Sequence, residues 1–158
     1  MGIDPGSIVT GFGVIEIDDA GAHPVGHGFV ATSSKQPLAE RLAVIHAEIS
    51  KQIAKFRPSE IAVENVFHAK NARSALMLGH ARGVVLLAAS QAGIPVFEYA
   101  PREVKLSVVG HGNASKAQVA SMVSRLLSID VSGMKEDESD AVAIAVCHLH
   151  KRTGAVSR

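Results

Sequence analysis

Hydrophobic and polar residues follow two periods along the chain, one typical of strands and one typical of helices. Residues 10–17 alternate and are rich in β-branched side chains, and the turn-forming run Asp18-Asp19-Ala20-Gly21 follows them. Apolar stretches at 3–4 and 25–31 flank this segment and are predicted to be strands as well. Because only short turns separate the three, we expect an antiparallel meander.

The helical period begins after this meander. Apolar residues recur every three or four positions over 37–56, which predicts an amphipathic helix. Pro58 ends this helix. The apolar positions are Leu38, Leu42, Ile45, Ile49, Ile53 and Phe56. Further strands are predicted over 61–66 and 95–99, and further helices over 72–92, 101–109, 115–127 and 137–151. Strands separated by helices imply an α/β fold with a five-stranded mixed sheet flanked by helices.

Composition limits the class of protein. A chain of 158 residues with 47% hydrophobic residues is long enough for one α/β domain over residues 1–158. The single cysteine, Cys147, excludes an internal disulfide and fits a reducing cytoplasm. The start lacks the basic region of a signal peptide, and no apolar stretch has the length of a membrane span. We therefore expect a cytoplasmic protein with no membrane partner.

Charge is distributed unevenly, although the net charge is only +1. Between residues 66 and 125 seven basic residues stand against two acidic ones, and between 126 and 140 five acidic residues stand against one basic. A basic segment beside an acidic cluster suits a polyanionic substrate with a metal site. Chance clustering on a solvated surface explains the charges equally well.

Four carboxylates lie in or next to apolar segments. Asp4 ends the first strand, Glu64 interrupts the run IAVENVF, and Asp137 and Asp140 share one face of the last helix. Converging carboxylates repel unless a cation neutralises them, and oxygen ligands select a hard ion such as Mg²⁺ or Mn²⁺. Taken singly, each has a structural alternative: Asp4 capping its turn, Glu64 facing solvent, and Asp137 or Ser139 as a helix N-cap.

The glycine-rich start, MGIDPGSIVTGFGVI, allows two interpretations of Asp4. Such a turn can hold the phosphates of a nucleotide, or its aspartate can hold a metal ion. The distant acids favour the metal. The glycines then let the chain turn sharply beside Asp4 and let a DNA backbone come close.

Four blocks resemble the RuvC family of bacterial Holliday junction resolvases: GIDPGSIVTGFGVI, AVENVFHAKNARSALMLGHARGV, VFEYAPREVKLSVVGHGNASKAQV and DESDAVAIAVCH. The resemblance implies an RNase H-like fold and a homodimeric endonuclease that cuts two opposed strands of four-way junction DNA in recombination and repair, with a branch-migration motor complex as partner. Family members usually carry several apolar residues before the first block, so either the first strand is short here or the numbering starts late. The family's functional positions fall on Asp4, Glu64, Asp137 and Asp140 (catalytic and metal-binding) and on Phe67, Lys105 and Lys116 (DNA-binding).

The expected mechanism uses two divalent ions per active site, with Asp4 bridging them. One ion activates a water and the other stabilises the leaving 3′-oxygen, which leaves a 5′-phosphate. Lys105 and Lys116 would pair with phosphates, although solvated helix lysines are the alternative. Phe67 would stack on an unpaired base, or it is an ordinary core aromatic.

Other features allow less specific predictions. The helix over 72–92 is apolar nearly all round and rich in small residues, so either one subunit buries it or a second copy of the chain does. The histidines of the basic region and the last helix are expected to be structural or surface residues, namely His68, His80, His111 and His148.

Two rival functions remain open at this point. One is an actin- or sugar-kinase-like phosphotransferase, for which the chain is too short to hold a second domain. The other is an inactive junction-binding scaffold, which would gain from losing negative charge near DNA.

Overall fold

The computed structural model describes residues 1–19, 21–65 and 71–156, and the side chains of all of these except 153–156. Five strands within this part of the chain form one mixed sheet in the order β3-β2-β1-β4-β5. Their bounds are Gly2–Asp4 (β1), Val9–Asp18 (β2), Gly21–Ala31 (β3), Ile61–Glu64 (β4) and Val96–Tyr99 (β5).

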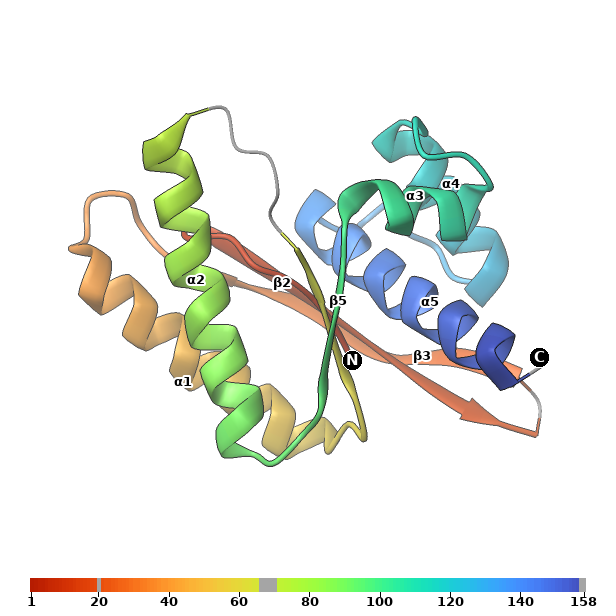
Figure 1. Cartoon of the computed structure of the whole chain (residues 1–158), viewed down its shortest axis with the longest axis horizontal. Helices are drawn as coiled ribbons and strands as arrows, with labels where there is room; N and C mark the ends of the chain where they lie inside the picture. The colour runs from red at the N-terminus through yellow and green to blue at the C-terminus, as the bar shows by residue number, and fades with distance from the viewer. Residues whose placement is uncertain (20, 66–70, 157–158) are drawn as a thin grey trace.

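Helices cover both faces of the sheet (Figure 1). One layer holds α1 (Leu38–Phe56) and α2 (Ala72–Gln91), which lie side by side. The other layer holds α3 (Pro101–Val109), α4 (Lys116–Leu127) and α5 (Glu136–Val156). The predicted α/β class, a five-stranded mixed sheet flanked by helices, is therefore confirmed. None of the described helices combines the length and the apolar character that a membrane crossing requires.

The strand pairing brings the ends of β1 and β4 together. The meander is confirmed, since β2 pairs antiparallel with both β1 and β3. β4 pairs parallel with β1, with Ile3 opposite Val63, and also parallel with β5. Strands β2 and β3 and helix α5 are longer than the hydrophobic pattern predicted, because the regular backbone structure continues beyond the periodic apolar residues. Ser115 and Gln118 form the predicted capping box of α4.

Alternating side chains of β4 build two separate cores. Ile61 and Val63 are fully buried against the layer of α1 and α2, whereas Ala62 faces the layer of α3, α4 and α5. A strand buried on both faces reads as a continuous apolar run rather than an alternating one. The three residues of β4 before Glu64 are all buried, and Glu64, the last residue of the strand, is the first that is partly exposed. A carboxylate can therefore stand at this position.

Glycines of β1 and β2 let α5 lie directly on the sheet. A Cβ at Gly11 would overlap the carbonyl oxygen of Asp137, and one at Gly13 would lie 2.8 Å from the Cα of Val142. The interpretation that these glycines admit a DNA backbone is therefore wrong for Gly11 and Gly13, because α5 already occupies the space beside them. Gly6 does serve the sharp turn, since a Cβ there would overlap the carbonyl oxygen of Val9.

Replacing Gly13 by Ala should therefore destabilise the protein by about 1–3 kcal/mol, because the added methyl group forces α5 away from the sheet. Gly133→Ala is the matched control, since nothing lies within 4 Å of a Cβ at that position. Urea unfolding of both variants measures the difference. Equal stability of the two variants would show that the contact between α5 and the sheet is not tight.

Candidate active site at the carboxyl ends of β1 and β4

Two of the four predicted carboxylates come from neighbouring parallel strands. Asp4 ends β1 and Glu64 ends β4. Since Ile3 pairs with Val63, the next residues of both strands are Asp4 and Glu64, and in parallel strands paired side chains share a face. The sheet therefore places both carboxylates side by side at one edge.

The other two carboxylates come from the first turns of α5. Asp137 lies against Gly11, which is itself the pairing partner of Asp4. Asp140 follows one turn later. Because α5 begins at Glu136, the alternative that Asp137 or Ser139 caps this helix is wrong. In Figure 1 the first turn of α5 lies at the same edge of the sheet as the end of β4.

Electrostatics show that these acids act on one another. Burial, and then the charges of Glu64, Asp140 and Asp137, raise the pKa of Asp4 to about 8. Burial, followed by the charge of Asp140, also raises the pKa of Glu64. The structure therefore places Glu64, Asp137 and Asp140, the other three residues predicted as metal ligands, within electrostatic reach of Asp4.

Two lysines partly offset this negative charge. Lys116 Nζ lies 2.7 Å from Asp140 Oδ2 and also contacts Glu136. Burial works to lower the pKa of Lys116, but its hydrogen bonds to Asp140 and Glu136 outweigh burial and raise it. The positive charges of Lys116 and Lys105 both lower the pKa of Glu64, so these lysines border the acidic site.

The donor set fits a hard divalent cation. All four side chains are carboxylates, and the pKa of Asp4 is raised first by burial and then by the repulsion of the other acids. Bound metal would relieve both effects by stabilising the charged carboxylate. Within the described part of the chain, no three acidic, histidine or cysteine side chains stand close enough together to hold an ion as they are. Since Lys116 already contacts Asp140, metal binding requires small movements of these side chains.

Comparison with known proteins shows which family the chain belongs to. Residues 1–148 match the family described as Crossover junction endodeoxyribonuclease RuvC. The chain belongs to this family. Its RuvC relatives in Myxococcus xanthus and Koribacter versatilis are each 49% identical to it, over 99% and 95% of this chain and 82% and 91% of theirs.

Solved structures extend the comparison to the fold. A structure of T. thermophilus RuvC in complex with Holliday junction substrate has a TM-score of 0.89 at 38% identity, covering 97% of this chain and 94% of that one. The yeast mitochondrial Holliday junction resolvase Ydc2 has a TM-score of 0.65 at 14% identity, which shows a shared fold. The expected RNase H-like fold of the RuvC family is confirmed.

The remaining predicted residues are Phe67 and the four histidines. Phe67 and His68 lie outside the described residues, so the position of the predicted DNA-contacting aromatic stays a prediction. His80 and His111 are exposed. His148 is buried, with Nδ1 at 2.7 Å from Tyr99 Oη and Nε2 at 2.8 Å from Glu60 Oε2, as expected for a structural histidine.

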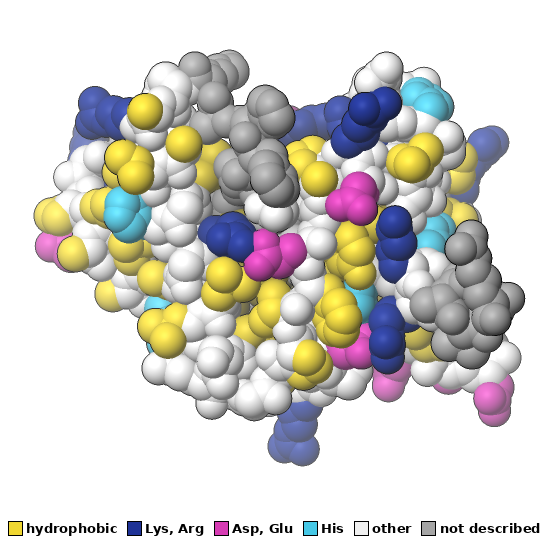
Figure 2. All heavy atoms as spheres, viewed as in Figure 1, with side chains coloured by type: hydrophobic (Ala, Val, Ile, Leu, Met, Phe, Trp, Pro, Cys, Tyr) yellow, Lys and Arg dark blue, Asp and Glu magenta, His cyan; other side chains and the backbone are white. Residues whose placement is uncertain are grey.

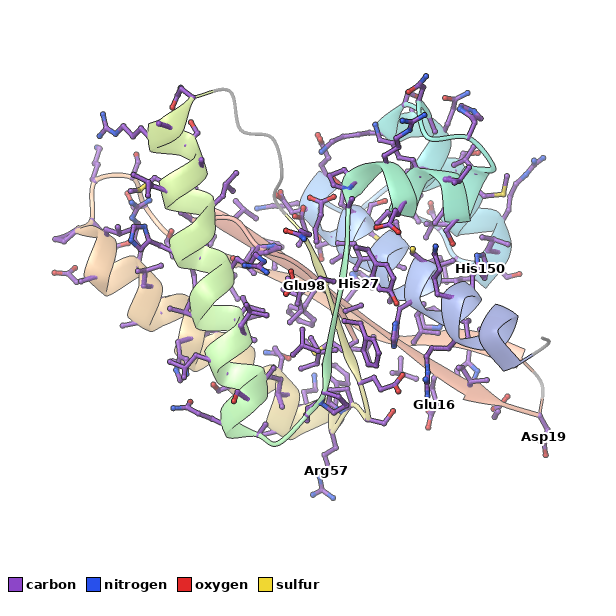
Figure 3. All side chains as sticks on the ribbon, viewed as in Figure 1. Glu16, Asp19, His27, Arg57, Glu98 and His150 are labelled. Carbon is purple, nitrogen blue, oxygen red and sulfur yellow. The ribbon has the colours of Figure 1, made fainter. Side chains whose placement is uncertain are left out.

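Sequence reasoning missed a fifth acidic residue beside the site. Glu138 is buried, and its Oε2 accepts a hydrogen bond of 2.8 Å from the backbone N–H of Lys135, which precedes α5. Its Oε1 lies 3.1 Å from Nδ1 of His27 on β3 (Figure 3 labels His27). The carboxylate thus caps the helix that carries Asp137 and Asp140. Its position at the start of an apolar helix was the available signal.

The raised pKa of Asp4 makes a prediction for the metal-free protein. Between the unfolded pKa near 4 and the folded pKa of about 8, the native state binds the extra proton, so this group lowers stability as pH rises. Asp4→Asn should remove this loss, by up to about 1.4 kcal/mol per pH unit, and raise the melting temperature at pH 8 in EDTA.

Asp19→Asn is the control, because it makes the same change at an exposed position. Melting curves from pH 5 to pH 8.5 provide the measurement. A parallel pH dependence in wild type and Asp4→Asn would contradict the electrostatic coupling at this site.

Proposed function

We propose that this protein is an endonuclease that resolves four-way (Holliday) DNA junctions by metal-dependent hydrolysis of two opposed phosphodiester bonds. One observation carries the proposal: Asp4, Glu64, Asp137 and Asp140 come together where β1 and β4 end. Burial, and then the charges of the other three acids, raise the pKa of Asp4 to about 8. A carboxylate cluster of this kind has no structural benefit, because it destabilises the metal-free fold. Membership of the RuvC family supports the same function.

The four carboxylates would hold two Mg²⁺ ions, with Mn²⁺ as a substitute. Bound metal would supply an activated water and stabilise the leaving oxygen. Asp4 has the central place, since it is the residue whose pKa responds to all three other acids. Its strand lies in the middle of the sheet, between β2 and β4, so the backbone that carries Asp4 is held by a strand on each side.

DNA would approach from the edge where Lys105 and Lys116 border the acids. Both lysines already act electrostatically on Glu64, so a phosphate held by them would lie next to the carboxylates. Lys116 contacts Asp140 and Glu136 in the free protein, which keeps its ammonium group at the site. Phe67 follows β4 by three residues and is proposed to stack on a base at the junction centre.

Paired cuts on a two-fold symmetric junction call for two active sites, and α2 supplies the best surface for a homodimer. Ala81, Val85, Ala88 and Ala89 are buried against the subunit's own core. On another face of α2, Leu76 is 62% and Leu87 49% exposed. Figure 2 shows hydrophobic side chains on the surface along this helix.

Gly79 and Gly83 continue the exposed face between the two leucines, and nothing lies within 4 Å of a Cβ at either glycine. Small residues between exposed leucines allow a second helix to approach closely. We propose that α2 of a second subunit packs here. A branch-migration motor complex as a further partner, and a location in the cytoplasm, remain predictions from the sequence.

The decisive test is cleavage of a synthetic four-way junction with and without Mg²⁺, against linear duplex DNA. Wild type should cut the junction only with metal, and Asp4→Asn should lower the rate by at least about 100-fold while junction binding is spared. Asp19→Asn should cut like wild type. Tight binding without any Mg²⁺-dependent cutting by wild type would favour the inactive scaffold.

The dimer surface can be tested with the double variant Leu76→Glu and Leu87→Glu. Charges on both exposed leucines should convert the dimer to monomer, because they would be buried unpaired in the interface. Sedimentation measures the conversion of dimer to monomer, and the melting temperature of the variant should stay close to that of wild type. Ile17→Glu, at a position 63% exposed on β2, is the control. A wild-type protein that sediments only as a monomer with junction DNA present would exclude this account of paired cuts.

A further inference from the structure

The turn after Asp4 is held by side chains from three different elements. Within β2, Thr10 Oγ1 donates a hydrogen bond of 2.7 Å to the Gly6 carbonyl oxygen and accepts one from its N–H. Thr32, which follows β3, donates through Oγ1 to the Ser7 carbonyl oxygen at 2.8 Å. The third donor is Arg41 of α1, whose Nη1 lies 3.1 Å from the same Ser7 oxygen.

Arg41 is an unusual residue for its place in the fold. It occupies the apolar stripe of α1, in the i, i+4 series that continues through Ile45, Ile49 and Ile53, and it is only 8% exposed. Its Nη2 lies 4.0 Å from Sδ of Met77 on α2. Within the described residues no carboxylate pairs with it, and its buried Nε has no hydrogen-bond partner.

Stability alone does not account for a guanidinium at this position. A buried charge that lacks a carboxylate partner destabilises a fold, and an apolar side chain of similar volume often stabilises it instead. The Ser7 oxygen does not depend on Arg41, because Thr32 already donates to it. What Arg41 adds is a rigid connection from α1 and α2 to the turn that leads out of Asp4.

We propose that Arg41 is a positioning residue for the active site, which holds the turn at residues 5–8 so that the Asp4 carboxylate meets metal in the correct place. The inference rests on the proposed function. α5 constrains β1 and β2 from one face of the sheet through Gly2 and Gly11, and Arg41 constrains the turn between these strands from the opposite layer. Asp4 is thereby kept in place against the repulsion of three other acids.

Arg41 acts through Ser7 rather than on DNA directly. The Arg41 side chain on α1 is more than nine-tenths buried and contacts Met77 of α2, so it presents almost no surface to a phosphate. The inference therefore concerns metal affinity and the rate of cutting, whereas junction affinity should stay constant.

The test compares Arg41→Met with Lys51→Met. Both remove one positive charge from α1 and introduce the same side chain, but Lys51 is exposed. Arg41→Met should lower the rate of junction cutting by about 10- to 100-fold, or weaken Mn²⁺ binding by a similar factor. Its melting temperature without metal should equal or exceed that of wild type. Lys51→Met should match wild type in both readouts.

Arg41→Lys keeps the charge without the reach of the guanidinium, so it should show the same loss of rate or of Mn²⁺ affinity as Arg41→Met. It provides the test if Arg41→Met does not fold. Mn²⁺ affinity, measured from the metal-dependent rise in melting temperature, tests the role of Arg41 even if wild type cuts no junction. A wild type that cuts no junction would contradict the proposed function but not the positioning role of Arg41. Rates and Mn²⁺ affinities within twofold of Lys51→Met would overturn the inference. A weaker junction affinity with a salt slope reduced by about one would also overturn it, because that result identifies a phosphate contact.

Discussion

The contact between α5 and the glycines of β1 and β2 is the constraint on which the rest of the site depends. Only a residue without a Cβ lets the first turn of α5 come against β2, and this approach brings Asp137 beside Gly11, the pairing partner of Asp4. A larger residue at these positions would move two of the four carboxylates away from the other two. The geometry of the site is thus fixed by main-chain packing rather than by its charged groups.

Those charged groups oppose the packing that unites them. The structure raises the pKa of Asp4 to about 8, which means that the metal-free protein holds this carboxylate in an unfavourable environment. Lys116 reduces the conflict by contacting Asp140 and Glu136, and Lys105 contributes from α3. A site built in this way favours binding of cations, and the same two lysines border it.

The two helical layers contribute differently to this site. The layer of α3, α4 and α5 supplies charged side chains, whereas the layer of α1 and α2 supplies support through Arg41 and an exposed apolar face on α2. An ion pair between Arg82 of α2 and Glu98 of β5 joins the layer of α1 and α2 to the edge strand of the sheet (Figure 3 labels Glu98). Support for Asp4 and the proposed subunit interface therefore belong to the same pair of helices.

The sequence by itself determined the class of fold and predicted which carboxylates make up the candidate site. Periodicity placed α1 and β2 within a few residues, because local amphipathic patterns reflect which side chains face a core. Acidic residues next to apolar segments identified Asp4, Glu64, Asp137 and Asp140, since unpaired carboxylates are costly there. Only the tertiary structure decided that Gly11 and Gly13 serve α5, that Glu138 lies beside His27, and that Arg41 reaches Ser7. These contacts join residues that lie from 34 to more than 120 positions apart, and no local pattern encodes such pairings.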